Sequence, residues 1–284
     1  MKYKQAVAIL IVIIIGFSIV PGADQKLRYQ YQKGKSYQYI ITSDMASESE
    51  AMGQPINVTA KNYLKYTLIV DDINSAGNFV CTARIDSFDM KMDSPMMPGN
   101  LPDPKEFVGK RVSVTINNTG KVIEAAALDK FSPPAGAMMG RTPEGMLKEA
   151  YFTPPEQEVE TNVPWKSTKT DTINQPMMGF PILSNTESEY TIIGNETVGK
   201  YDCLKIAINS KSKRSGSGTT SQGMDLGIDA KGTTTGFIYF AMKEGIVVKM
   251  DTTTDMESVT SVTAPQAFTS TTISKVKATM ELAQ

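Results

Sequence analysis

Sulfur-bearing side chains are the most distinctive chemical groups of this chain, which has two cysteines, 17 methionines and no histidine among 284 residues. Histidine is the commonest general base and a common metal ligand, so its absence excludes a Ser–His–Asp hydrolase and leaves too few ligands for a closed zinc site. No segment has the ligand spacing of a calcium loop or the lysine of a phosphate loop. We therefore expect a protein that is not an enzyme and that needs no metal or cofactor.

The two cysteines, Cys81 and Cys203, end two copies of one pattern. Each copy reads Tyr-Thr-aliphatic-Ile, a turn, and then Gly-x-aromatic-x-Cys, beginning at Tyr66 and at Tyr190. One interpretation is a disulfide, which would stabilise the fold by roughly 2–4 kcal/mol. The interpretation that we favour is a pair of buried thiols that act as small hydrophobes on core-facing strand positions.

The methionines gather in segments 90–97 and 138–146 and at residues 177–178. A flexible, polarisable thioether suits adaptable contacts with apolar ligands, although it also serves as core filler and can bind copper(I). Filler is the simplest interpretation, and an apolar ligand surface is the functional one. The aromatic and methionine residues that we expect to line such a surface are Trp165, Phe237, Tyr239, Met146, Met177 and Met178.

Strands must position these residues, because alternation of apolar and polar residues with aromatic and β-branched types recurs through the chain. Hairpin turns are indicated at residues 74–77, 117–120 and 243–245. The strands expected from this pattern cover residues 27–33, 36–43, 57–70, 79–88, 111–116, 121–126, 165–172, 187–193, 200–210, 237–242, 246–251 and 252–282.

Breaks in the alternation predict loops and one helix. Residues 90–104 and 174–181 combine methionine with proline, and residues 215–232 are rich in glycine, serine and threonine, which favours a long flexible loop. Residues 142–152 read as a short helix, with Thr142 as N-cap and Pro143 at the first helical position.

The repeat extends beyond the cysteines, since the hairpin at 112–123 matches the one at 237–248, with Gly120 corresponding to Gly245. This order predicts an internal duplication, with halves at about 24–135 and 164–284 joined by the helix region 142–152; chance convergence of antiparallel hairpins is the alternative. The fold class expected is mainly β: one large curved antiparallel sheet, similar to a half-barrel, made of two meander halves with one or two short helices.

Residues 1–23 have the character of an export signal. Lys2 and Lys4 precede an apolar run at residues 6–20, which is short for a membrane-spanning helix. We expect cleavage after Ala23 and a mature β-rich domain at 24–284 that is periplasmic or secreted; an uncleaved anchor is the alternative. The formal charge of −1 argues against a nucleic-acid partner.

Four short motifs carry a resemblance to a known group: Gly34-x-x-Tyr37, Val163-Pro-Trp165, Gly199-Lys-Tyr-Asp-Cys203 and Gly236-Phe-Ile-Tyr239. With the signal, they resemble exported bacterial β-rich domains of unknown function, which are distantly similar to periplasmic lipoprotein carriers with a half-barrel sheet and a helical lid. The resemblance implies a concave sheet that holds an apolar ligand, either a lipid or a lipidated chain. The alternatives are a structural or interaction domain of the cell envelope, partnered by another envelope protein, and a hydrolase with paired carboxylates.

Overall fold

The computed structural model describes residues 25–51, 54–95, 103–131, 147, 151–174, 179–220, 223–264 and 267–283, and its strands form one antiparallel sheet. The expected fold class, mainly β with a single curved sheet, is confirmed. The eleven strands are β1 (Ser36–Ala51), β2 (Gln54–Ile73), β3 (Phe79–Asp93), β4 (Arg111–Ile116), β5 (Val122–Ala127), β6 (Trp165–Asn174), β7 (Pro181–Val198), β8 (Tyr201–Thr219), β9 (Asp225–Ala241), β10 (Ile246–Ala264) and β11 (Phe268–Leu282).

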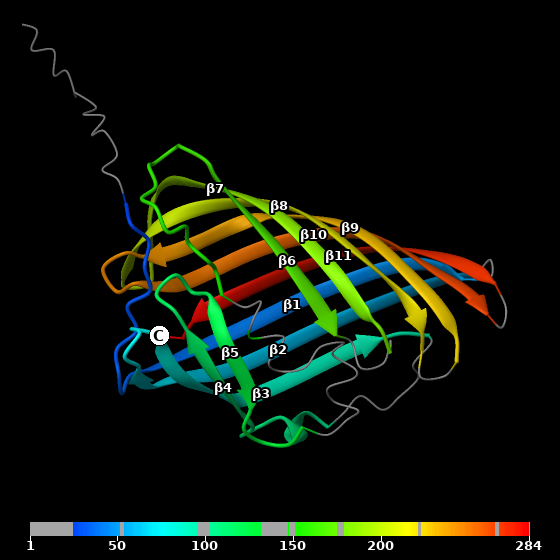
Figure 1. Ribbon diagram of the computed structural model, residues 1–284, viewed down its shortest axis with the longest axis horizontal. Helices are drawn as coiled ribbons and strands as arrows, with labels where there is room; N and C mark the ends of the chain where they lie inside the picture. The colour runs from blue at the N-terminus through cyan, green and yellow to red at the C-terminus, as the bar shows by residue number, and fades with distance from the viewer. Residues whose placement is uncertain are drawn as a thin grey trace, which may run out of the picture.

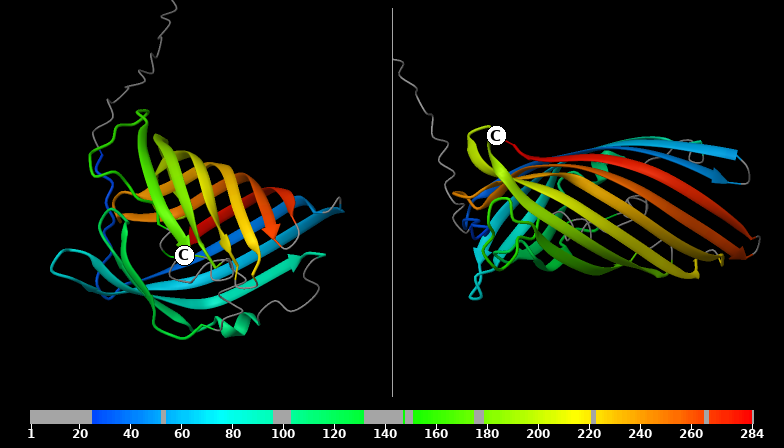
Figure 2. Two further views of the ribbon diagram at one scale, coloured as in Figure 1. Left: turned by 45° about the vertical axis from the view of Figure 1, so that its right-hand side comes forward. Right: turned by 90° about the horizontal axis from the view of Figure 1, so that it is seen from above.

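The strand order is β5-β4-β3-β2-β1-β11-β10-β9-β8-β7-β6. Strands that follow one another in the chain are therefore neighbours in the sheet, except β5 and β6, which form its two edges. The pairing of β1 with β11 joins the first and last strands. The sheet curves so that both edge strands come round in front of the central ones (Figures 1 and 2). The result is an open, half-barrel-like sheet.

A segment before β1, residues 25–35, crosses one end of this sheet (dark blue in Figure 1). Its side chains Leu27, Tyr29 and Tyr31 are at most 3% exposed. The Tyr29 amide donates to the Asn118 carbonyl, and the Gln30 amide donates to the Gly245 carbonyl. The strand predicted at 27–33 is therefore wrong: these residues alternate because they fill the core, and they hydrogen-bond to turns rather than to a neighbouring strand.

Two glycines let the turns approach this segment closely. Gly120, in the β4–β5 turn, has φ 73°, and Gly245, in the β9–β10 turn, has φ 63°. A Cβ at Gly120 would collide with the Tyr29 ring, and one at Gly245 would collide with Gln30. These are the two glycines that the repeat aligned, and consecutive residues of one segment contact them. The internal duplication itself stays a prediction.

At the opposite end of the sheet the strands are longer than expected. β8 continues to Thr219 and β9 begins at Asp225, so the flexible loop predicted at 215–232 is wrong. The glycines there fit close packing: a Cβ at Gly216 would lie 2.7 Å from the Pro181 carbonyl oxygen, and one at Gly218 would lie 2.7 Å from the Phe180 Cβ. Glycine and serine predict a loop here because the same small residues also occur where strands pack closely.

Helical structure in the described chain is limited. A 3₁₀ turn, η1 (Pro104–Glu106), is capped by the Asp103 carboxylate, which accepts from the Lys105 amide at 2.9 Å. Of the helix predicted at 142–152, Leu147 is helical and packs against the core, and Tyr151 and Phe152 are no longer helical. The other residues of that helix, and the signal at 1–23, lie outside the described residues. No helix in the described ranges is long and apolar enough to cross a membrane.

Candidate functional site

The two faces of the sheet differ in what packs on them. Segment 25–35 and residues 151–164, which precede β6, pack on one face, where the Tyr29 and Phe240 rings are 5.7 Å apart and the Phe152 and Tyr190 rings 5.4 Å. Successive side chains of a strand point to opposite faces, so the pairing register shows which residues of each strand share this face. We call it the inner face, and the opposite one the outer face.

We call the half of the sheet that carries segment 25–35 the closed end, and aromatic residues fill its inner face. Tyr39 stacks on Tyr66 and Trp165 on Tyr190, with ring centroids 5.6 Å apart in both pairs. Burial raises the pKa of Tyr29, Tyr39 and Tyr66 well above the ordinary tyrosine range. The closed end is therefore a packed hydrophobic core.

The other half, the open end, has an inner face of a different kind. Its five central strands, β2, β1, β11, β10 and β9, carry mainly serine, threonine, glycine and alanine there, with a few aliphatic residues and methionines. Most of these side chains are only half-buried. The inward-facing residues, assigned by register, are Ile56, Val58, Ala60 and Asn62; Ser43, Met45, Ser47 and Ser49; Phe268, Ser270, Thr272, Ser274, Val276 and Ala278; Thr252, Thr254, Met256, Ser258, Thr260 and Val262; and Leu226, Ile228, Ala230, Gly232, Thr234 and Gly236.

Charge separates completely between the two faces of these five strands at the open end. None of the inward-facing residues just named is charged, whereas the outer face carries cross-strand ion pairs such as Lys61–Asp44 and Lys231–Glu257. A conventional surface sheet would mix charges with polar residues on any wetted face. The inner face at the open end is therefore uncharged and lined by small side chains, which suits contact with an apolar partner.

The flanking strands bring the first inward-facing charges. On β8, Arg214 lies between Ser184 of β7 and Ala230 of β9, both of which share its face. On the edge strand β6, Lys169 and Asp171 form an ion pair of 2.9 Å. Inward charges at a sheet edge discourage pairing with a further strand, so the β6 pair has a ready structural explanation.

Two of the predicted lining residues, Phe237 and Tyr239, lie on the outer face. Ile238 and Phe240 on β9 are at most 1% exposed on the inner face, so alternation places the predicted pair on the face opposite to Trp165. Tyr239 is nevertheless only 6% exposed and belongs to the buried hydrophobic cluster. Lys205 Nζ lies 4.7 Å from the Phe237 ring centroid and 5.5 Å from that of Tyr239. The expectation that the aromatic residues share one concave surface is thus corrected. Phe237 instead borders a shallow outer-face depression of ≈ 520 Å³.

Trp165 does lie on the inner face, at the closed end, and is 8% exposed. Its indole nitrogen Nε1 is buried and has no hydrogen-bond partner among the described residues. The predicted lining residues Met146, Met177 and Met178 lie outside the described residues. Of the three predicted lining residues that the structure describes, none lies on the inner face of the open end.

Cys81 on β3 and Cys203 on β8 are free, buried thiols. Five strands separate β3 from β8 in the sheet. Burial raises the pKa of Cys81 to about 12 and that of Cys203 to about 11. Such thiols are poor nucleophiles at neutral pH.

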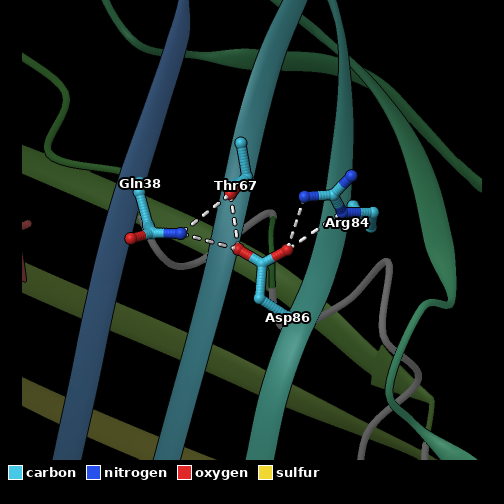
Figure 3. A network of polar contacts seen from close by, with 4 residues as sticks. All are labelled: Gln38, Thr67, Arg84 and Asp86. Atoms are coloured by element: carbon cyan, nitrogen blue, oxygen red, sulfur yellow. Dashed lines mark hydrogen bonds and ion pairs between the residues drawn. The ribbon is translucent and has the colours of Figure 1, made fainter.

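A polar network on the outer face of β1, β2 and β3 surrounds Asp86 (Figure 3). Thr67 and Gln38 donate to one carboxylate oxygen, and Arg84 donates to the other at 2.9 Å. Burial alone would raise the pKa of Asp86, but hydrogen bonds from Thr67, Arg84 and Gln38 outweigh it and lower that pKa. The network stabilises the irregular pairing at this point, where the register of β2 and β3 shifts between Lys65 and Tyr66.

Acidic pairs suitable for hydrolysis were one alternative expectation. Asp251 and Glu281 both bind Lys249 Nζ on the outer face, at 3.2 and 3.1 Å. These two carboxylates pair with one lysine across neighbouring strands, an ion-pair arrangement that belongs to the outer face of the sheet. In the described ranges, no group of three or more cysteine, aspartate or glutamate residues could hold a metal ion.

Sequence reasoning missed the open-end inner face. The signal was present in residues 252–278, where every second residue is uncharged and Asp255, Glu257, Lys275 and Lys277 all fall on the other set. Segregation of charge by parity over adjacent strands distinguishes the uncharged inner face from the charged outer one.

No protein-family model matches the chain, and no curated protein matches it at a significant level. Among solved structures, a lipovitellin chain, described under "Lipid-protein interactions in lipovitellin", is similar to it with a TM-score of 0.45 and 10% identity. The match covers 90% of this chain and 26% of the lipovitellin chain. A similarity of this size carries no information on function, which has to come from the site itself.

Proposed function

We propose that the protein is an exported, non-enzymatic binding protein that holds an apolar ligand, a lipid or the acyl chain of a lipidated protein, against the inner face of the open end. The observation that carries this proposal is the complete separation of charge between the two faces of five adjacent strands.

The dimensions of this surface suit an acyl chain. A stretch such as residues 252–262 spans roughly 33 Å at strand rise, which is longer than the ~15 Å of one leaflet of a ~30 Å bilayer core and so long enough for one acyl chain. Serine and threonine at the inner positions leave space above the sheet, and the aliphatic residues and methionines supply apolar contact. Burying a chain there would gain about 0.8 kcal/mol per methylene group.

Export is the second part of the proposal. The apolar run at residues 6–20 after Lys2 and Lys4 supports it. Because segment 25–35 completes the core, cleavage after Ala23 would leave every described part of the fold intact. Sequencing the N-terminus of the protein recovered from the cell envelope or medium tests the cleavage, and an intact Met1 would contradict it.

A matched pair of tryptophan variants tests the ligand surface. Ser258 and Ser261 lie on the same strand, β10, with Ser258 on the inner face and Ser261 on the outer face. Ser258→Trp would fill space on the inner face, whereas Ser261→Trp adds the same bulk outside. Delipidated wild-type protein is titrated with Nile red, a neutral apolar dye, and lipid that co-purifies without detergent is identified by mass spectrometry.

We expect the wild type and Ser261→Trp to bind the dye equally and to co-purify with lipid, and Ser258→Trp to bind about tenfold more weakly. Equal binding by all three proteins would place the dye elsewhere. Absence of both dye binding and lipid would favour the alternative, a structural domain of the cell envelope without a ligand.

A further inference from the structure

We infer that the outer-face depression beside Phe237 is a second binding site, and that it takes a neutral sugar ring of an oligosaccharide. The depression lies on the opposite face of the sheet from the apolar surface of the open end, so the two sites are occupied independently. This inference goes beyond the proposed function and does not depend on it.

Two rows of outward-facing side chains border the depression, each with one residue from β9, β10 and β11. The row nearer the closed end consists of the register partners Phe237, Asp251 and Thr279. The second row lies two residues further towards the open end, about 7 Å at strand rise, and consists of Thr235, Thr253 and Lys277. The volume of ≈ 520 Å³ falls within the range of about 300–1,000 Å³ found for small-molecule sites.

Phe237 supplies the apolar wall of this depression, and its side chain is 38% exposed. Lys205 Nζ lies 4.7 Å from the Phe237 ring centroid and 5.5 Å from that of Tyr239, so the ammonium occupies the side of the ring turned towards Tyr239. The remaining side borders the depression. The face of an aromatic ring is electronegative, so it attracts the weakly positive C–H bonds that a sugar presents on one side of its ring.

Hydrogen-bonding groups of both kinds line the rest of the depression. Asp251 Oδ1 accepts from the Thr279 hydroxyl at 2.9 Å, and Asp251 Oδ2 lies 3.2 Å from Lys249 Nζ. These contacts hold the carboxylate in place and leave it lone pairs for a ligand. Within the described part of the chain, the Thr253 hydroxyl and the Lys277 ammonium make no hydrogen bond or ion pair. The hydroxyl groups of a sugar can therefore both donate and accept here.

The charges at the depression select against ionic ligands. Asp251 on β10 would repel an anion, and Lys277 on the neighbouring strand β11 would repel a cation. A neutral polyhydroxylated molecule is compatible with both, because one of its hydroxyl groups can donate to the carboxylate while another accepts from the ammonium. An open-chain polyol offers the same hydroxyl groups without a ring face to pack on Phe237, so a cyclic sugar is favoured.

The experiment measures the binding of three neutral tetrasaccharides, cellotetraose, maltotetraose and N-acetylchitotetraose, by saturation-transfer NMR. Open-chain sorbitol is the control for hydroxyl groups alone. Phe237→Leu keeps apolar bulk but removes the ring, and Thr253→Val keeps the shape but removes the hydroxyl. Thr233→Val, on the outer face of β9 but outside the depression, is the matched control. Titration of each variant with Nile red reports separately on the inner face.

We expect at least one tetrasaccharide to bind the wild type and sorbitol not to bind. Phe237→Leu should weaken that binding about tenfold and Thr253→Val about fivefold, the ranges of one aromatic contact and one neutral hydrogen bond. Thr233→Val should leave it unchanged. All three variants should keep the Nile red affinity of the wild type, because their substitutions lie on the outer face.

Absence of binding by all three tetrasaccharides, or equal binding by the wild type, Phe237→Leu and Thr253→Val, would overturn the inference and leave the proposed function standing. Sorbitol binding as tight as that of the tetrasaccharides would also contradict it. Failure of Nile red to bind, with sugar binding retained, would count against the proposed function alone. Should Phe237→Leu not fold, the comparison of Thr253→Val with Thr233→Val still decides.

Discussion

The closed and open ends belong to the same long strands and share their backbone pairing, yet the side chains on their inner faces differ in size and burial. At the closed end the inner face carries large aromatic residues, and segment 25–35 covers them so completely that Leu27 and Phe240 are 0% exposed. At the open end the same strands continue with serine, threonine and glycine, which stay half-buried. The comparison indicates that stability is concentrated at one end, so that the other end can present a surface that is not needed for folding.

Backbone pairing explains how the open end persists without a core of its own. The β8–β9 pairing continues without interruption from Cys203↔Ala241 to Thr219↔Asp225. A ladder anchored at a packed end can extend, because each further residue adds hydrogen bonds at the cost of ordering that residue alone. Cross-strand pairs such as Ser188–Ser210 at 2.7 Å and Thr234–Thr254 at 2.8 Å add to it.

The largest effect expected is alkaline unfolding that begins at the closed end. Tyr29, Tyr31, Tyr39 and Tyr66 have pKa values raised by burial, whereas an unfolded tyrosine ionises near pH 10. Above pH 10 the unfolded state loses protons that the folded state keeps. Stability is therefore fully present below pH 10 and falls by about 1.4 kcal/mol per tyrosine for each further pH unit. Circular dichroism and absorbance at ~295 nm should show cooperative unfolding together with tyrosine ionisation.

If the tyrosines ionise gradually near their ordinary pKa while the sheet stays intact, they are wetted, and the closed end is not the packed core described above.

The next effect separates two phenylalanines that both face inward. Phe240 at the closed end is 0% exposed and contacts Tyr29 and Phe152, while Phe268 begins β11 at the open end and is half-buried. Phe240→Ala should lower the free energy of unfolding by about 3–5 kcal/mol, and Phe268→Ala by about 1 kcal/mol. Urea denaturation measures both, and equal losses would remove the distinction between the two ends.

A smaller effect concerns reactivity. With pKa values of about 12 and 11, the thiolate fraction at pH 8 is about one in ten thousand for Cys81 and one in a thousand for Cys203. Ellman's reagent should label neither thiol of the native protein within minutes, and both at once in urea. Rapid labelling of the native protein would show that the closed end opens readily.

The smallest effect is expected on the outer face of the open end. Lys231 Nζ lies 3.1 Å from Glu257, but the lysine side chain is 71% exposed. Lys231→Gln should change the free energy of unfolding by less than about 0.5 kcal/mol, because exposed ion pairs contribute little. A loss above 1 kcal/mol in a urea titration would mean that outer-face charges hold the open end together.

The fold class could be predicted from the sequence because alternation and turn glycines are local signals. The hairpin at Gly120 and the one at Gly245 are examples, since positive φ angles require glycine there. The role of segment 25–35 could not be predicted, because alternation of Leu27, Tyr29 and Tyr31 reads as a strand whether the partner is a neighbouring strand or the end of a half-barrel.

The candidate site was harder to predict for a related reason. Their aromatic side chains suggested Phe237 and Tyr239 as lining residues. Which face of the strand a residue lies on depends, however, on whether it is an odd or even number of positions from a residue known to be buried, here Phe240. The residues that line the open end are mainly small and polar, so no individual residue type marks the surface. Only the register across β9, β10 and β11 reveals that their uncharged positions coincide.

The most direct measurement compares single cysteines introduced at Ser258 and Ser261, on opposite faces of β10. The native thiols are buried and give little background. Thiol labelling rates are measured with and without lauryl alcohol, a neutral ligand. The account predicts that the ligand slows labelling at position 258 at least about tenfold and leaves position 261 unchanged. Equal protection at both positions, or protection at neither, would contradict it.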